Sequence, residues 1–136
     1  MEPMSREDQN AIAGVLSGVA EHVRAEGGLG YLYRRWQEVA HKVQAGYDLT
    51  IDDYTNDLST RDILARVLRA VSPSAGRAIE AAIEEADSVF RSATVPSERT
   101  VYGKPLDLDG WWWHRIPKRA GEELGEDLRK LGLEGG

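Results

Sequence analysis

Apolar residues recur every three or four positions through most of residues 1–93, which is the spacing of one face of an α-helix. Ser5 and Asp8 match a capping box, so a first helix is expected from there to the glycines of EGGLG at residues 26–30. A second helix is expected over about residues 30–45. The apolar positions of these two helices are Ile12, Val15, Leu16, Val19 and Val23, and then Leu29, Leu32, Trp36, Val39, Ala40, Val43 and Tyr47.

Two overlapping start signals follow. Thr50 with Asp53 predicts a short helix, whereas Ser59 with Asp62 predicts the start of a longer one. Pro73 then suits the first turn of a fourth helix, because that position has no intrahelical partner for an amide N–H. The apolar faces of the two longer helices comprise Ile63, Leu64, Val67, Leu68 and Val71, and then Ala75, Ile79, Ala82, Ile83, Ala86, Phe90 and Ala93.

Three consecutive tryptophans follow a segment, residues 91–110, that has little periodicity. Pro117 disfavours helical backbone at Ile116, so the tryptophan run is predicted to be extended. An extended run places Trp111 and Trp113 on one side, and Trp112 and Ile116 on the other. One of these pairs is expected to be buried against the helices, because an indole buries a large apolar area.

A last helix is predicted after residue 120, with Glu122 and Glu123 in its first turn, Leu124 and Leu128 facing inward and Gly132 at its end. The predicted fold class is therefore all-α. We expect a bundle of four to five helices, with an irregular extended aromatic segment and a short β pairing between TVYG (100–103) and GWWW (110–113). Residues 1–136 are expected to form a single helical domain, because their number is typical of one domain.

The composition excludes several classes of protein. There is no cysteine, so disulfide scaffolds and thiolate metal sites are excluded, and a reducing compartment fits. The start MEPMSREDQN does not match a signal peptide, and QNAIAGVLSGVA is about half the length that a membrane helix needs. We therefore expect a cytoplasmic protein.

The net charge is −6, and the acidic excess lies in the middle third, where residues 47–93 carry 5 basic and 9 acidic groups. Nonspecific nucleic-acid binding depends on cations that contact phosphates, so this balance argues against it. It favours a protein partner of basic character. Within this third, Asp52, Asp53 and Asp57 are predicted to contribute to binding.

Metal and catalytic patterns are weak. The acids of DLTIDDYTNDLS lack the spacing and the glycine of a calcium loop, and the three histidines show no zinc motif. We predict neither a metal nor a cofactor, and we favour a protein that is not an enzyme. Helix capping and an Asp57–Arg61 pair at i, i+4 would account for most of the acids.

The fourth predicted helix carries a charged strip, which comprises Arg77, Glu80, Glu84, Asp87 and Arg91. Intrahelical pairs such as Arg77–Glu80 and Asp87–Arg91 would explain it as a solvated face. The alternative is a docking strip for a basic partner, provided that the acids of residues 52–57 lie beside it.

Residues 111–119 combine aromatic and basic side chains. A ring that is not buried would form a recognition patch with the cations that follow it, because tryptophan and arginine dominate protein hot spots and aromatic rings also stack on unpaired bases. The predicted binding residues of this segment are Trp112, His114, Arg115, Lys118 and Arg119.

Gly14 and Gly18 lie on a second face of the first predicted helix. Interior glycines destabilise a helix, so close packing of another helix there is expected. That helix would come from the same molecule or, alternatively, from a second copy in a homodimer.

The leading functional hypothesis is a small non-enzymatic protein-binding module, for instance an inhibitor or immunity-type partner of a basic protein. The alternative is binding of single-stranded nucleic acid or a small ligand through residues 111–119. A small enzyme is the third hypothesis, and a deep cleft in which polar side chains converge beneath the tryptophans would favour it.

Overall fold

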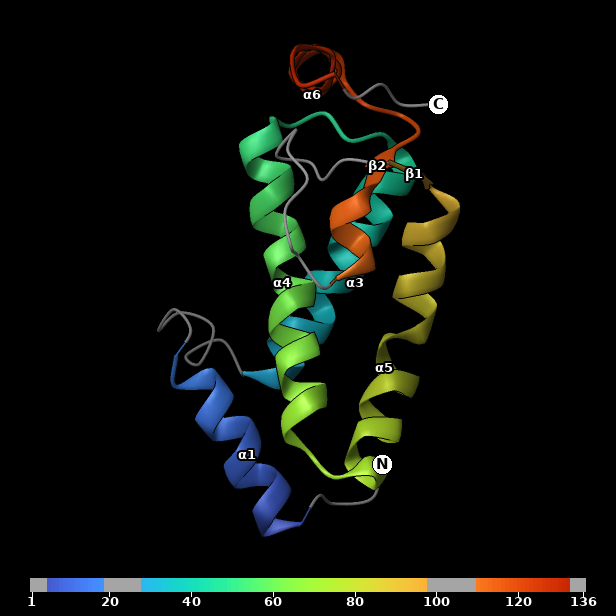
Figure 1. Ribbon diagram of the computed structural model, residues 1–136. Coiled ribbons are helices and arrows are strands. Elements are labelled where there is room, and N and C mark those ends of the chain that lie inside the picture. The colour runs from blue at the N-terminus through green and yellow to red at the C-terminus, as the bar shows by residue number, and fades with distance from the viewer. Residues whose placement is uncertain (1–4, 19–27, 98–109, 133–136) are drawn as a thin grey trace.

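The computed structural model describes residues 5–18, 28–97 and 110–132. Figure 1 shows three long helices side by side, α3 (Leu29–Ala45), α4 (Ile51–Ala70) and α5 (Pro73–Ser92). Successive helices run in opposite directions because short connections join them. The shorter α1 (Arg6–Leu16) lies against α4, and α6 (Glu122–Lys130) lies across one end of the bundle. The predicted all-α bundle is confirmed.

The boundaries of α3 and α5 agree with the predictions. The apolar sector predicted for α3 is buried except for Leu29, which is partly buried, and Trp36 is fully inaccessible. Pro73 lies in the first turn of α5, as the sequence indicated, and the hydroxyl of Ser72 caps the start of the helix. Val19 and Val23 of the first predicted helix lie outside the described residues, and α1 is described only as far as Leu16.

The two start signals between α3 and α5 produce one continuous helix. Thr50 and Asp53 form the predicted capping box at the start of α4. The second predicted start is wrong, because the Ser59 hydroxyl donates to the Asn56 carbonyl inside the helix. Asp62, expected to complete that cap, accepts hydrogen bonds from a distant part of the chain instead. The two polar side chains that matched a helix cap therefore form their hydrogen bonds with other partners, and the helix continues through them.

The tryptophan run is not extended. Trp111–His114 form a 3₁₀ turn, η1, and only then does the chain become a strand, β2 (Arg115–Pro117). This strand pairs in antiparallel register with β1 (Thr94–Pro96), so Val95 lies opposite Ile116. A short β pairing therefore exists, but its second strand follows GWWW, and the predicted partner TVYG lies outside the described residues. Pro117 restricts only the residue before it, so the turn can precede the strand.

The core lies between α3, α4 and α5 and is closed by η1 and α6. The rings of Trp36 and Phe90 pack with centroids 5.1 Å apart, which joins α3 to α5. Tyr47 and Tyr54 pack edge to face at 5.2 Å, and the hydroxyl of Tyr54 donates to the carbonyl of Arg115 at 2.9 Å. Burial raises the pKa of both tyrosines, so each stays neutral and can donate.

The final helix is attached to the bundle by contacts ahead of its first residue and by one of its own side chains. Ahead of it, the Tyr47 amide donates to the Arg119 carbonyl at 2.7 Å, and Gly121 lies so close to Asp48 that a Cβ there would be 2.7 Å from the Asp48 Cα. Inside it, the carboxylate of Asp127 accepts from the amide of Ile51 at 3.2 Å, in the first turn of α4. Leu124 and Leu128 are buried as predicted, and Gly132 has a positive φ at the helix end.

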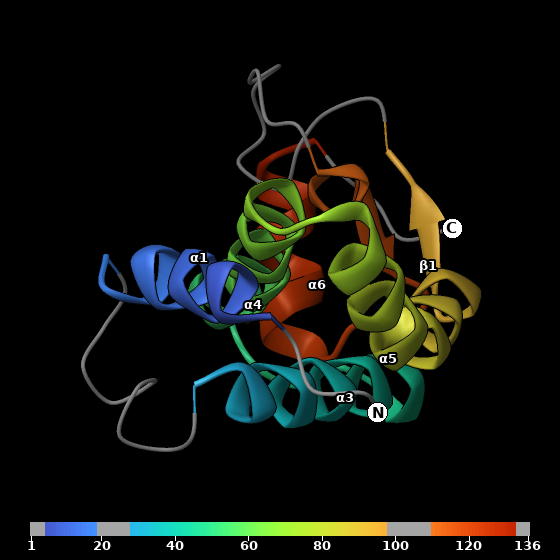
Figure 2. The same ribbon diagram turned by 90° about the horizontal axis from the view of Figure 1, so that it is seen from below.

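The helix α1 packs against α4, and its Leu16 belongs to the core, against which Ile12 also packs. Figure 2 shows it beside α4, on the opposite side of that helix from α5. The expected close packing of another helix of the same molecule on Gly14 and Gly18 is wrong for the described residues. A Cβ at Gly14 would meet nothing within 4 Å, and one at Gly18 would meet only the backbone of its own helix.

Asp8 connects α1 to the turn between α4 and α5. Its carboxylate accepts from the amide and from the hydroxyl of Ser72, both at 2.8 Å. The predicted capping box is therefore only half formed, since Ser5 accepts from the Asp8 amide but the Asp8 side chain points to another helix. The hydrogen bonds from Ser72 lower the pKa of Asp8, because they stabilise the charged form.

Asp8→Asn is expected to destabilise the fold at neutral pH by an amount that shrinks in acid. A carboxyl group whose folded pKa is lowered stabilises the native state above its unfolded pKa, near 3.8, and this contribution disappears as the pH falls through the lower folded value. Urea denaturation of both proteins across the acid range measures the difference. A difference in unfolding free energy that does not change with pH would contradict this role for Asp8.

Candidate functional site

The tryptophan turn places its three rings in different environments. Trp112 and Trp113 are each only 4% exposed, whereas Trp111 is half-buried and packs against Phe90 with ring centroids 5.8 Å apart. Trp112 and Ile116, one of the two predicted pairs, are both buried, and Trp113 is buried as well, although an extended run would place it on the other side. Trp112 was assigned to the predicted recognition patch, and its burial removes its ring from the surface.

Both buried indoles donate to one carboxylate oxygen. The Nε1 atoms of Trp112 and Trp113 lie 2.9 and 2.8 Å from Oδ1 of Asp62 on α4. The turn is tight, and a Cβ on Gly110 would lie 2.3 Å from the Trp112 ring, so only glycine fits there. Sequence reasoning missed Asp62, because its spacing from Ser59 matched a helix cap.

A buried ion pair lies beneath these rings. Arg61 of α4 and Asp87 of α5 are 6% and 8% exposed, and Nε and Nη2 of the guanidinium donate to the two carboxylate oxygens at 2.9 and 3.0 Å. Asp87 also accepts from Nε1 of Trp36 at 2.8 Å. The Cζ atom of Arg61 lies 4.5 Å from the centroid of Trp112, within cation–π range. The predicted intrahelical partners, Asp57 for Arg61 and Arg91 for Asp87, are therefore wrong.

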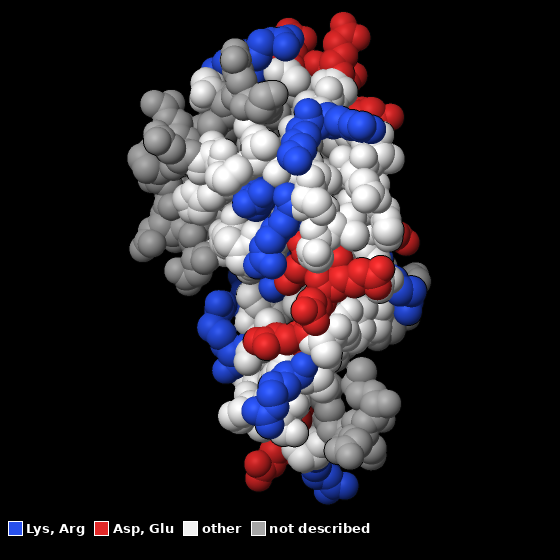
Figure 3. All heavy atoms as spheres, turned by 90° about the vertical axis from the view of Figure 1, so that its right-hand side faces the viewer, with Lys and Arg blue, Asp and Glu red and all other residues white. Residues whose placement is uncertain are grey.

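This ion pair lies in the wall of a groove between α4 and α5. The groove has a volume of about 570 Å³, which is within the range of ligand pockets. Its lining combines both signs of charge with apolar side chains, and it comprises Arg61, Leu68, Arg77, Glu80, Ala81, Ile83, Glu84, Asp87, Arg91 and Trp111. Figure 3 shows a face of the molecule on which acidic side chains form a band between basic side chains.

Trp111 lines the groove with Arg91 stacked on it. The Cζ atom of Arg91 lies 4.1 Å from the centroid of the Trp111 ring, and Arg61 lies 5.9 Å from the same centroid. Trp112 meets Trp111 edge to face at 5.5 Å, which fixes the orientation of the ring. The half-exposed indole is thus held in place by rigid neighbours, as an aromatic anchor at a binding surface requires.

The predicted acidic binding residues do not converge on the groove. Asp57 is 2% exposed and is surrounded by donors, since Lys42 Nζ lies 3.4 Å and the Tyr47 hydroxyl 2.6 Å from Oδ2, and Arg35 binds the other oxygen. It therefore joins α3 to α4 inside the molecule. Asp52 and Asp53 are exposed in the first turn of α4, and neither lines the groove.

The capping hydrogen bonds from Thr50 lower the pKa of Asp53. This carboxylate is therefore charged at neutral pH, but it is already bound to the end of its own helix. Asp52 is the predicted acidic residue that stays accessible without such a role. Asp52 and Asp53 were predicted to bind a basic partner, and that remains a prediction.

Burial inside the fold also reduces the acidic excess of the middle third. Of the nine acids in residues 47–93, Asp57, Asp62 and Asp87 accept hydrogen bonds from buried or half-buried partners, and of the five cations Arg61 is buried. Six acids and four cations of residues 47–93 remain, so the acidic excess falls from four charges to two. The charge of this third is therefore a weaker guide to a partner than its composition indicates.

The predicted cations after the tryptophans lie outside the groove. Arg115 caps the end of α5, where its Nη2 donates to the carbonyls of Arg91 and Thr94 at 3.0 and 2.9 Å, and burial lowers its pKa. His114 is half-buried, and its backbone carbonyl accepts from Ser97 at 2.6 Å. Lys118 and Arg119 are exposed between β2 and α6, close to the C-terminal ends of α3 and α5.

Residues 5–18, 28–97 and 110–132 contain no group of three or more His, Asp or Glu side chains placed to hold a metal ion. In the same ranges, no helix combines the length and the apolar character that crossing a membrane requires.

No family model matches the chain, and no curated protein or solved structure is significantly similar to it.

Replacing each tryptophan by alanine is expected to separate the buried rings from the half-exposed one. Trp112→Ala and Trp113→Ala each remove a buried indole and leave Asp62 with one donor fewer, so each should cost about 3–5 kcal/mol of unfolding free energy. Trp111→Ala should cost clearly less. Urea denaturation followed by circular dichroism measures the three values, and equal small losses would show that none of the rings belongs to the core.

The Arg61–Asp87 pair is expected to show strong coupling. Arg61→Met or Asp87→Leu alone leaves a buried charge without its partner, and each should cost about 3–5 kcal/mol. The double variant should be more stable than the sum of the two losses implies, because neither charge is then present. A double-mutant cycle in urea measures the coupling, and additive losses would show that the pair does not act as a unit.

Proposed function

We propose that this chain is a protein-binding module that docks a charged segment of its partner along the groove between α4 and α5. The observation that carries the proposal is the half-exposed Trp111, stacked on Arg91 and lining a charged groove. Tryptophan and arginine together are the side chains most enriched in protein hot spots. The groove also provides the concave surface that a helix or extended segment needs in order to bury area.

The charges of the groove favour a partner segment with a particular charge pattern. Glu80 and Glu84 are exposed one turn apart on α5, so they offer two carboxylates to basic side chains. Arg77 and Arg91 lie on the same helix before and after them, and they suit an acidic group at either end of the bound segment. We therefore infer a partner segment with a basic centre, which agrees with the basic character expected from the net charge of −6.

Apolar contacts complete the proposed interface. Leu68 of α4 and Ala81 of α5 line the groove with Trp111, so the partner should also carry an apolar side chain among its charges. The rigid indole contributes contact area at a low entropy cost. An inhibitor or immunity-type protein, which neutralises a basic protein by covering it, is the specific form of this function that we favour.

Single-stranded nucleic acid suits this surface less well. Stacking on bases needs exposed rings in a positive groove, but two of the three consecutive indoles are buried here. The remaining ring, Trp111, shares its groove with Glu80 and Glu84, which repel phosphates. Fewer observations support a small enzyme than support a protein-binding module. The two buried ionic groups of the groove, Arg61 and Asp87, are paired with each other and are not directed at a substrate.

The proposal is tested by comparing what the wild-type protein and charge-reversed variants bind. Glu80→Lys with Glu84→Lys reverses the groove, whereas Glu85→Lys with Glu122→Lys makes the same change in net charge at exposed positions that do not line it. Each protein is immobilised, and native-cell proteins retained at physiological salt are identified by mass spectrometry. A genuine partner should bind the wild type and the control pair but not the groove variant.

Trp111→Ala provides a second, uncharged test with the partner so identified. Its affinity should fall by about 2 kcal/mol or more if the indole is a hot spot, as isothermal titration calorimetry can measure. Thermal melts confirm that each variant is folded. The proposal fails if no protein distinguishes the groove variant from the control pair, or if Trp111→Ala binds the partner as tightly as the wild type.

A further inference from the structure

The chain between β2 and α6 is held across the C-terminal ends of α3 and α5. On one side, the Lys118 amide donates to the Ala93 carbonyl at 2.9 Å, just after α5. On the other side, the Arg119 carbonyl accepts from the Tyr47 amide at 2.7 Å, just after α3, and Tyr47 forms an isolated parallel bridge with Ala120. Two neighbouring cations are therefore carried by a backbone that is fixed at both ends.

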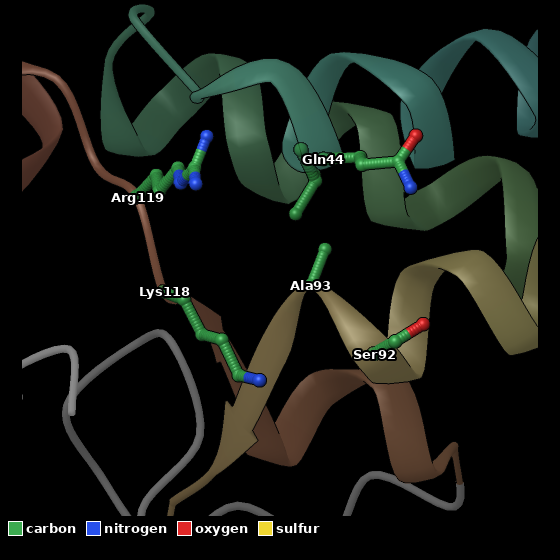
Figure 4. A pocket seen from close by; sticks show the side chains of 6 residues that line it. Gln44, Ser92, Ala93, Lys118 and Arg119 are labelled. Carbon is green, nitrogen blue, oxygen red and sulfur yellow. The ribbon is translucent and has the colours of Figure 1, made fainter.

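A second pocket lies beneath these two residues. Its volume is about 330 Å³, and it is lined by Val43, Gln44, Ser92, Ala93, Lys118 and Arg119. Figure 4 shows the Arg119 side chain on the side of Gln44, the Lys118 side chain on the side of Ser92, and the Ala93 methyl group pointing between them. No residue lines both this pocket and the groove between α4 and α5.

The cations of this pocket have no assigned role in the fold. Neither Lys118 nor Arg119 forms an ion pair within the part of the chain that the structure describes. Cations near helix C-termini often neutralise the helix dipole. Here the last carbonyls of α5 are already bound by Arg115 and by the hydroxyl of Thr94.

We propose that this pocket binds a small organic dianion, either a dicarboxylate or a phosphate monoester. Lys118 supplies a point charge and Arg119 a planar guanidinium on opposite sides of the pocket, so each can pair with a negative charge of a ligand that lies between them. Gln44 adds an amide that can donate, and Val43 and Ala93 provide apolar contact for a short carbon chain. The Ser92 hydroxyl donates to Ser88 at 2.7 Å, so it offers the ligand an acceptor for a hydroxyl group.

The test uses succinate and methyl phosphate as dianionic probes and succinamide as a neutral analogue, titrated into the full chain by calorimetry. At least one of the two dianions should bind at a ratio of one per chain, with an affinity that falls as salt is added. Lys118→Gln and Arg119→Gln should each weaken it by about tenfold or more, the effect of losing one charge-assisted hydrogen bond. Which dianion binds tells dicarboxylate from phosphate recognition.

Two further variants separate the pocket from a general effect of surface charge. Lys130→Gln removes a cation from the exposed face of α6 and should leave binding unchanged. Ala93→Leu keeps both cations but fills the pocket, and it should abolish binding while thermal melts show a folded protein. The inference is overturned if neither dianion binds at millimolar concentration, if succinamide binds equally well, or if Lys118→Gln and Lys130→Gln behave alike. Loss of the partner-binding groove would leave all these results unchanged, because the two sites share no lining residue.

Discussion

The buried ion pair between Arg61 and Asp87 is the interaction on which the rest of the bundle depends. Removing two charges from water is costly, and further contacts of both side chains offset part of that cost here, although Nη1 of Arg61 has no hydrogen-bond partner among the described residues. Asp87 accepts from Trp36 of α3 as well as from α4, and Arg61 lies against Trp112. The ion pair thus joins α4 to α5, while the hydrogen bond from Trp36 attaches α3 to it and the ring of Trp112 attaches the tryptophan turn.

The same contact also contributes to the wall of the groove that is proposed to bind a partner. The Cζ atom of Arg61 lies 5.9 Å from the centroid of the Trp111 ring, and that of Arg91 lies 4.1 Å from the same centroid. The indole is therefore oriented by charges and rings that the fold itself requires. A binding groove whose walls are core elements loses little conformational entropy when a partner docks, which favours affinity.

Helix positions followed from the sequence because local rules determine them. The apolar spacing located α3 and α5, and the Thr50–Asp53 capping box located the start of α4. Where two local rules competed, tertiary contacts decided. Asp62 matched a helix cap but accepts from two distant indoles, and Asp57 and Asp87 matched intrahelical pairs but bind side chains on other helices. Local spacing carries no information on such partners, so the groove could not be predicted either.

The late position of the tryptophan turn in the chain has a consequence for synthesis. Trp112, Trp113 and Ile116 fill the space between helices that end by residue 92. While a ribosome makes the protein, those helices emerge before the residues that seal them, and Asp62 then has no indole to bind. Leu124 and Leu128 of α6 belong to the same core, so the bundle should reach its final packing only after α6 has also left the exit tunnel.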